Sequence, residues 1–251
     1  MQQDGLEAAL AATGEQLAQA SRAAAVVSRE LKRASQAAAA GATRDLRKAL
    51  AAVEAATREL EAQDSSFDFD ETAYLAGGGY AKELLAQAQE QGVAMFEEDE
   101  RLLCYPSLVR LVPGDAAIEV DRKRDKRLRP SVVVAALKAR QDRPLRVKAE
   151  PFLESLLGAY ELLAVGRADP VVRLDAVWGV LTLLPGQARD YSRPEFARDL
   201  YLLDQSGVTT SKAGRALRWH ASTGTKGAGV LTTVARSGQQ QRYWGVSFTS
   251  A

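Results

Sequence analysis

The chain has 251 residues, of which 46% are hydrophobic and 26% charged, proportions typical of a globular protein. One cysteine, Cys104, excludes an internal disulfide framework and a cysteine-rich zinc site. The start "MQQDGLEAAL" has no basic segment before an apolar run, and no apolar stretch approaches the ~20 residues that span a bilayer. We therefore expect a cytoplasmic protein without membrane contact, and its many alanines predict a mainly α fold.

The net charge of +1 conceals a strong segregation of charge along the chain. Residues 61–100 hold eleven acidic residues and one lysine, whereas residues 121–148 hold eleven basic and three acidic residues. No acidic residue follows Asp204. This pattern favours a surface that faces a polyanion. The alternative is that the acidic segment folds back on the basic one, within the molecule or an oligomer.

Residues 1–63 are predicted to form an alanine-rich helical hairpin or coiled coil. One heptad series contains Leu10, Leu17, Ala24, Leu31 and Ala38, and another contains Leu6, Thr13, Ala20, Val27 and Ala34. Gly41 and Thr43 indicate a turn, because the next seam (Leu46, Leu50, Val53, Thr57 and Leu60) is out of phase with the first. We expect residues 5–63 to mediate assembly, either in a homo-oligomer or with a partner protein.

Residues 64–148 are predicted to contain an acidic linker, a short helix at 80–91, a small β region and a basic helix. Short β-prone runs separated by turn signals predict antiparallel strands near 93–96, 101–105, 107–112 and 117–121. A helix is expected to begin at Pro130–Ser131. The preceding basic patch consists of Arg122, Lys123, Arg124, Lys126, Arg127 and Arg129. It suits non-specific phosphate contact or docking of an acidic protein surface.

Three patterns in this middle region suggest chemistry but do not match a known motif. Asp68-Phe69-Asp70 lacks the glycine and the distal glutamate of a calcium loop, and "AGGGYAKE" is not a P-loop. Asp115, Glu119, Asp121 and Lys123 resemble a metal-dependent nuclease core, but their spacing differs from it. We keep a nuclease as an outside alternative and expect no catalytic residue, metal or cofactor.

Residues 149–251 are predicted to be helical with a C-terminal β-hairpin. An apolar helix covers 173–184, and a second, at 191–205, opens with Ser192 and Glu195 in capping-box spacing. A third helix is expected from Thr209 or Thr210 to about His220. "GVLTTVAR", the turn "SGQ" and "QQRYWGVSF" follow as a predicted hairpin.

This order of elements resembles the winged helix-turn-helix family over about the last eighty residues. The residues that carry the resemblance are Phe196, Ala197, Leu200, Gly207, Val208, Ala213, Ala216, Leu217 and the "SGQ" wing. The resemblance implies that the third helix enters the major groove and that the wing touches an adjacent groove or the backbone. The long stretches "YLLDQSGVTT" and "STGTKGAG" depart from the family pattern and leave protein docking open as another use.

A helical projection of residues 209–220 predicts which side chains would meet DNA. It places Ala213, Ala216, Leu217 and His220 on a core-facing side, so His220 is interpreted as a core histidine. The predicted nucleic-acid contacts are Thr209, Thr210, Ser211, Lys212, Arg215, Arg218 and Trp219 in this helix, and Lys226, Arg236 and Arg242 near the wing.

The sequence thus predicts a non-enzymatic protein that binds duplex DNA through a C-terminal winged helix. It would act as a regulator or as the DNA-binding subunit of a larger bacterial machine. The alternative is an adaptor or scaffold subunit in which the coiled coil and the winged helix dock other proteins.

Overall fold

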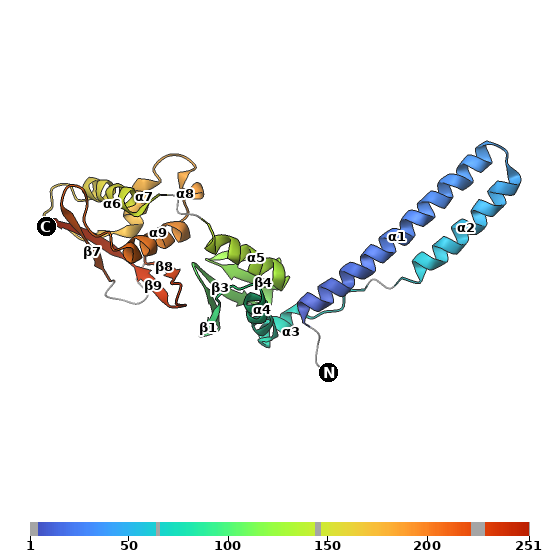
Figure 1. The fold of residues 1–251 in the computed structure, drawn as a ribbon, viewed down its shortest axis with the longest axis horizontal. Helices are drawn as coiled ribbons and strands as arrows, with labels where there is room; N and C mark the ends of the chain where they lie inside the picture. Colours follow the sequence, from blue (N-terminus) through green and yellow to red (C-terminus); the bar gives the residue numbers. More distant parts are fainter. Residues whose placement is uncertain (1–4, 64–65, 144–146, 222–228, 251) are drawn as a thin grey trace. The chain divides into compact units, whose positions relative to one another are not determined.

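The computed structural model describes residues 5–63, 66–143, 147–221 and 229–250 (Figure 1). It is about 54% helical, which confirms a mainly α protein with a small antiparallel sheet. The chain divides into two compact units, Met1–Tyr80 and Ala81–Ala251, where the sequence suggested boundaries at residues 63 and 148. Within the described ranges, no helix is both long and apolar enough to cross a membrane.

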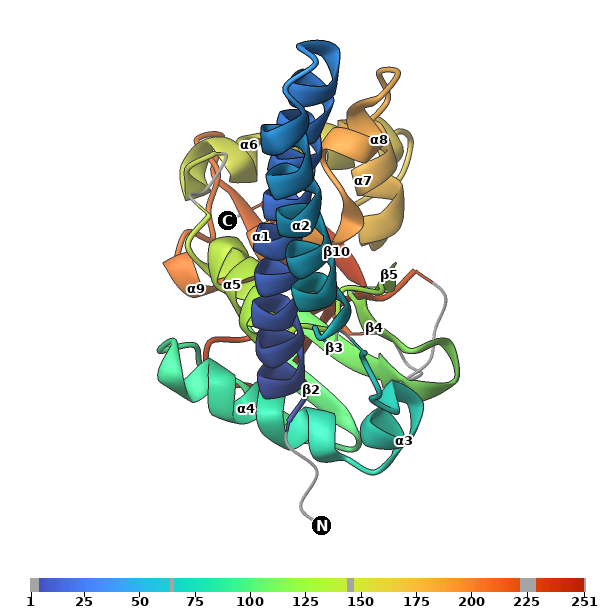
Figure 2. The same ribbon diagram turned by 90° about the vertical axis from the view of Figure 1, so that its right-hand side faces the viewer.

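The first unit is built on a long pair of antiparallel helices, as predicted (Figures 1 and 2). These are α1 (Leu6–Ala39) and α2 (Thr43–Glu61). The turn between them contains Gly41, whose φ of 69° lies in the left-handed region that glycine adopts without strain. The short helix α3 (Glu71–Ala76) follows, and Asp70 caps it by accepting a 2.8 Å hydrogen bond from the backbone N–H of Ala73.

The seam between α1 and α2 uses only part of the predicted heptad pattern. Its less exposed positions are Ala23, Val27, Glu30, Ala34 and Ala37 on α1, and Leu46, Ala49, Val53, Ala56 and Leu60 on α2. The predicted positions Leu17, Ala24, Leu31 and Leu50 are exposed, which corrects the expected seam. Small alanines occupy much of the seam, which lets the two backbones approach closely, whereas Leu17, Leu31 and Leu50 lie on exposed faces.

Glu30 is a buried polar residue in this seam, which an apolar pattern cannot predict. Arg33 donates to its carboxylate at 2.9 Å and Arg29 at 3.2 Å. Burial alone would raise the pKa of Glu30, but these arginines outweigh burial and lower it. The charge is therefore accommodated by its neighbours on the same helix.

The first part of the second unit is a five-stranded antiparallel meander with two helices. After α4 (Gly79–Glu90), the strands are β1 (Phe96–Glu98), β2 (Arg101–Cys104), β3 (Ser107–Val112), β4 (Ala117–Val120) and β5 (Lys123–Asp125). They lie in chain order, and a 3-10 turn (Pro113–Asp115) joins β3 to β4. Helix α5 (Pro130–Gln141) begins where predicted. The strands expected near 101–105, 107–112 and 117–121 are present, the one expected near 93–96 lies instead at Phe96–Glu98, and β5 was not expected.

The remainder of this unit combines helices with a three-stranded sheet. Its elements are α6 (Ala149–Leu163), β6 (Val172–Arg173), α7 (Leu174–Leu181), α8 (Gln187–Asp190), α9 (Arg193–Ser206), β7 (Arg215–His220), β8 (Leu231–Val234), β9 (Gln240–Tyr243) and β10 (Gly245–Ser250). The sheet order is β6-β10-β7, while β8 and β9 form a separate hairpin. One core includes Leu156, Phe196, Leu200, Val246 and Phe248.

The predicted third helix, residues 209–220, is wrong: this segment is a turn followed by strand β7. β7 pairs with β10 over its whole length, with Leu217 opposite Phe248. The backbone N–H of Ser211 donates to the carbonyl of Arg215 at 2.9 Å, and the hydroxyl of Ser211 accepts from the backbone N–H of Arg215 at 3.0 Å. Gly214, with a φ of 72°, lies in the same turn. In "RALRWH" the buried Leu217 and the exposed Arg218 alternate as a strand requires.

The predicted C-terminal hairpin is correct only in its first half. β8 and β9 pair around the "SGQ" turn, where Gly238 has a φ of 86°. Trp244, Val246 and Phe248 do not continue that hairpin, because the chain turns after Tyr243 and β10 joins β6 and β7 instead. The hairpin β8–β9 is therefore an insertion between two strands of the other sheet.

Candidate nucleic-acid interface

The residues predicted to read DNA from a helix are partly structural in the observed turn and strand. Ser211 is buried, and Thr210 forms an isolated bridge with Ala216. Thr209 is exposed, but its carbonyl accepts from the backbone of Leu217 at 2.8 Å. The backbone N–H of Lys212 donates to Glu154 at 2.7 Å, while its side chain is exposed. The helix N-terminus that would have held a phosphate does not exist here.

Arg215 and Trp219 contribute to packing, whereas Arg218 remains on the surface. The guanidinium of Arg215 donates to Asp169 at 2.8 Å and to the carbonyl of Phe248 at 2.5 Å. The ring of Trp219 packs on Tyr243 with centroids 5.2 Å apart. Of the three side chains, only Arg218 is exposed and can reach a ligand. His220 is half-buried and lies 2.8 Å from the hydroxyl of Ser247, consistent with a structural role.

The predicted wing cations have separate environments. Arg236 lies over the ring of Tyr105, with its guanidinium carbon 5.4 Å from the ring centroid. Arg242 is exposed on β9. Lys226 lies outside the described residues.

The secondary basic patch is located around the β4–β5 turn and the segment that follows. Arg124 forms an ion pair with Asp115 at 2.5 Å, and Arg127 one with Asp125 at 2.6 Å. The Arg127 side chain holds the pKa of Asp125 at about 2, well below its usual range. Arg122, Lys123, Lys126 and Arg129 are exposed. The basic residues of this patch thus lie at the surface, where Arg124 and Arg127 are paired with carboxylates.

Helix α9 presents little free surface along its length. Phe196, Leu200 and Leu203 are buried on one side. On another side the β8–β9 hairpin covers it: the hydroxyl of Tyr243 donates to Asp204 at 3.0 Å, and the backbone of Arg236 donates to the hydroxyl of Tyr201 at 3.3 Å. A helix covered in this way cannot be laid into a major groove without displacement of the hairpin.

The N-terminal end of α9 opens on a polar cleft of about 550 Å³. The opposite wall comes from the β4–β5 turn and the end of α5. Its cationic lining residues are Lys123, Arg140, Arg143, Arg189 and Arg198, and its acidic lining residues are Asp121, Asp190 and Glu195. Cations outnumber carboxylates, so the cleft favours an anionic ligand.

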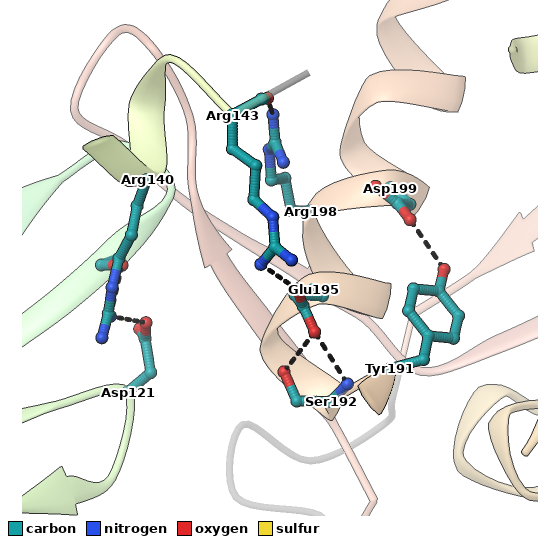
Figure 3. Close-up of polar contacts among 9 residues, drawn as sticks. Asp121, Arg140, Arg143, Tyr191, Ser192, Glu195, Arg198 and Asp199 are labelled. Carbon is teal, nitrogen blue, oxygen red and sulfur yellow. Dashed lines mark hydrogen bonds and ion pairs between the residues drawn. The ribbon is translucent and has the colours of Figure 1, made fainter. Parts of the chain in front are cut away.

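Two ion pairs orient arginines on the two walls of this cleft (Figure 3). Arg140 donates to Asp121 at 3.2 Å and to the hydroxyl of Ser107 at 3.3 Å. Arg143 donates to Glu195, which also accepts from the backbone N–H and the hydroxyl of Ser192 at 3.0 Å each. The predicted capping box of α9 is present. Its Glu195 also forms an ion pair with Arg143, which follows α5.

Arg198 is a buried cation whose hydrogen-bond partners are neutral (Figure 3). It donates to the backbone carbonyl of Arg143 and, at 3.5 Å, to the hydroxyl of Tyr105. Among the described residues no carboxylate pairs with it. A buried guanidinium without a counter-charge contributes positive potential to the cleft that it lines.

The acidic residues of the nuclease alternative are engaged separately. Asp115 is paired with Arg124, whereas Asp121 accepts from Arg140 and, at 2.9 Å, from the backbone N–H of Leu108. Glu119 is opposite Arg124 in the β4–β5 register. Over the described ranges, no group of three or more His, Cys, Asp or Glu side chains could hold a metal ion.

Sequence reasoning found Lys123 and the surface position of Arg218 but missed the cleft. Arg140, Arg143, Arg189 and Arg198 are not among the contact residues that the sequence predicts. Glu195 was read only as a helix cap. The one local signal was the density of arginine near both the end of α5 and the start of α9.

Comparisons of the chain with protein-family models, curated proteins and solved structures find no match.

Proposed function

We propose that the protein is a non-enzymatic nucleic-acid-binding subunit that holds the phosphate backbone in the cationic cleft between the β4–β5 turn and the start of α9. The observation that carries this proposal is the excess of cations in the cleft, five against three carboxylates, with the buried Arg198 among them. Lys123, which lines the cleft, also belongs to the exposed basic patch of the β4–β5 turn. The phosphate backbone of a nucleic acid could therefore contact cations both inside and outside the cleft.

The element order of residues 149–250 supports a winged-helix interpretation different from the one predicted. Helix α6 is followed by β6, then by α7, α8 and α9, and then by β7 and, after the β8–β9 hairpin, β10; the sheet order is β6-β10-β7. In this interpretation α9, rather than residues 209–220, is the third helix, and β8–β9 is inserted into the wing. Because that insertion covers α9, we expect binding that depends on phosphate contact and tolerates changes of base sequence.

The test is fluorescence anisotropy of the full chain with a labelled duplex of mixed sequence, between 50 and 200 mM salt. The cleft variant combines Lys123→Gln with Arg189→Gln, two exposed side chains whose loss leaves the ion pairs of Arg140 and Arg143 in place. We expect affinity to fall roughly tenfold, about 1.4 kcal/mol. The slope of log affinity against log salt should decrease by about 2.

A matched control removes the same charge elsewhere. Arg101→Gln with Arg110→Gln changes an exposed cross-strand pair on β2 and β3, outside the cleft lining. A third variant, Lys212→Gln with Arg218→Gln, tests the surface predicted from the sequence. The cleft assignment fails if wild type does not bind, or if either of these variants weakens binding as much as the cleft variant does.

A protein-docking subunit is the second candidate, and exposed apolar residues favour it. Leu183 and Leu184, in the segment after α7, are 75% and 67% exposed, and Leu162 and Val165 at the end of α6 are 68% and 78% exposed. Exposed apolar side chains mark protein interfaces where they gather into a contiguous patch. Absence of salt-dependent DNA binding by a correctly folded wild-type chain would favour this function over the first.

A further inference from the structure

Helix α1 carries an exposed face of mainly apolar and small residues along most of its length. At 100° per residue its members fall within an arc of about 100°. They are Leu10, Gly14, Leu17, Ser21, Ala24, Ser28, Leu31 and Ser35. All of them except the half-buried Leu10 are exposed, and Leu17 and Leu31 are 53% and 51% exposed. Large apolar side chains thus alternate with small ones on this face, and its one charged residue, Lys32, falls at the edge of the arc, at the same angle as Gly14.

This face is not the one that α2 covers. The seam positions Ala23, Val27 and Ala34 lie about 120° away around the helix. One neighbouring helix covers one side of α1, so α2 cannot also bury Leu17 and Leu31. The outward face is therefore available to another helix.

The two ends of the helix pair carry opposite charge. Residues 29–48, around the turn, contain Arg29, Lys32, Arg33, Arg44, Arg47 and Lys48 against Glu30 and Asp45. The other end, residues 5–20 and 52–63, contains Glu7, Glu15, Glu54, Glu59 and Glu61 against Arg58. A molecule with this distribution is complementary to a second copy of itself in the opposite direction, and repels a second copy in the same direction.

We propose that this face binds a second copy of the chain, with the two α1 helices antiparallel and centred on Ala24. That register places Leu17 opposite Leu31 of the second copy, and Leu31 opposite Leu17, with Ala24 against its equivalent. It also places each basic turn beside the acidic end of the other helix pair. The small residues Ser21, Ala24 and Ser28 at the centre let the helices approach closely, as alanine does in the α1–α2 seam.

The first measurement is sedimentation velocity of the full chain at micromolar concentration. We expect wild type at twice 27.0 kDa. Leu17→Glu combined with Leu31→Glu should weaken association at least a hundredfold, because four carboxylates would then meet in one interface. Ala8→Glu with Ala12→Glu adds the same charge to exposed positions of α1 outside the arc and should remain dimeric. A monomeric wild type, a higher oligomer, or equal effects of the two variants would overturn the proposal.

Disulfide trapping tests the antiparallel direction. The native Cys104 is fully buried and does not interfere. We expect an equimolar mixture of Leu17→Cys and Leu31→Cys chains to form mixed disulfide dimers under mild oxidation, whereas each variant alone forms few. Trapping of Leu17→Cys with itself would indicate parallel helices and contradict the proposed arrangement. This inference depends only on the first unit, so failure of the DNA-binding test leaves it intact.

Discussion

Replacing Arg215 and Arg218 separately with alanine distinguishes the observed strand from the helix that the sequence suggested. In a groove-binding helix both arginines would be surface residues, and either loss would weaken DNA binding with little effect on stability. In the observed strand, Arg215 joins the carbonyl of Phe248 on β10 to Asp169 before β6, whereas Arg218 is exposed.

The expected cost of Arg215→Ala follows from these contacts. A hydrogen bond from a charged donor contributes about 1.5–3 kcal/mol, and a half-exposed ion pair about 0.5 kcal/mol. The buried Nε of Arg215, which has no hydrogen-bond partner among the described residues, offsets part of this stabilisation. We expect a net loss of about 1.5–2 kcal/mol, which lowers the Tm by about 3–8 °C for a unit of this size. Arg218→Ala should change stability by less than about 0.5 kcal/mol.

The assay is thermal unfolding followed by circular dichroism, with urea unfolding of the same variants as a second measure. Equal Tm values for Arg215→Ala and wild type would refute the proposed role of the guanidinium in joining β10 to the segment before β6. If Arg218→Ala were as unstable as Arg215→Ala, the assignment of Arg218 to the exposed side of β7 would be wrong.

Two further predictions concern titratable groups near the cleft wall. Burial raises the pKa of Asp121, so the folded state holds this proton more tightly than the unfolded chain does. Its contribution to the unfolding free energy should therefore decrease as the pH rises above about 4. In urea unfolding, Asp121→Asn should gain stability relative to wild type over that range. A difference in unfolding free energy between the two proteins that is the same at every pH would contradict this. Burial also raises the pKa of Cys104 to about 11. At pH 8 the folded protein should resist iodoacetamide and react only in urea, whereas rapid modification without urea would show that the thiol is accessible.

The sequence predicted most helices because their signals are local. Pro130 marks the first turn of α5, and Ser192 with Glu195 forms the capping box of α9. The six residues of β7 were misread because buried and exposed side chains in so short a run fit both a helix and a strand. Pairing with β10 decides the outcome, and that partner lies about thirty residues further along the chain.

The cleft could not be predicted for the same physical reason. Arg143 meets Glu195 across 52 residues, and Arg198 meets Tyr105 across 93. No spacing rule connects such positions, because a fold rather than a helix or strand period brings them together. The basic patch could be predicted because its members lie close together in the sequence, and it remains the part of the proposed interface that the sequence itself supports.

The insertion of β8–β9 has a consequence for how the cleft meets a ligand. Val234 and Thr233 of β8 both donate to the carbonyl of Pro106, next to β3, and β9 is bonded to α9 through Tyr243. The hairpin thus fastens the five-stranded sheet to the helical part of the same unit, and with it the two walls of the cleft. A cleft fastened in this way is preorganised: its arginines are already in place, so a bound phosphate loses less free energy to the ordering of protein side chains.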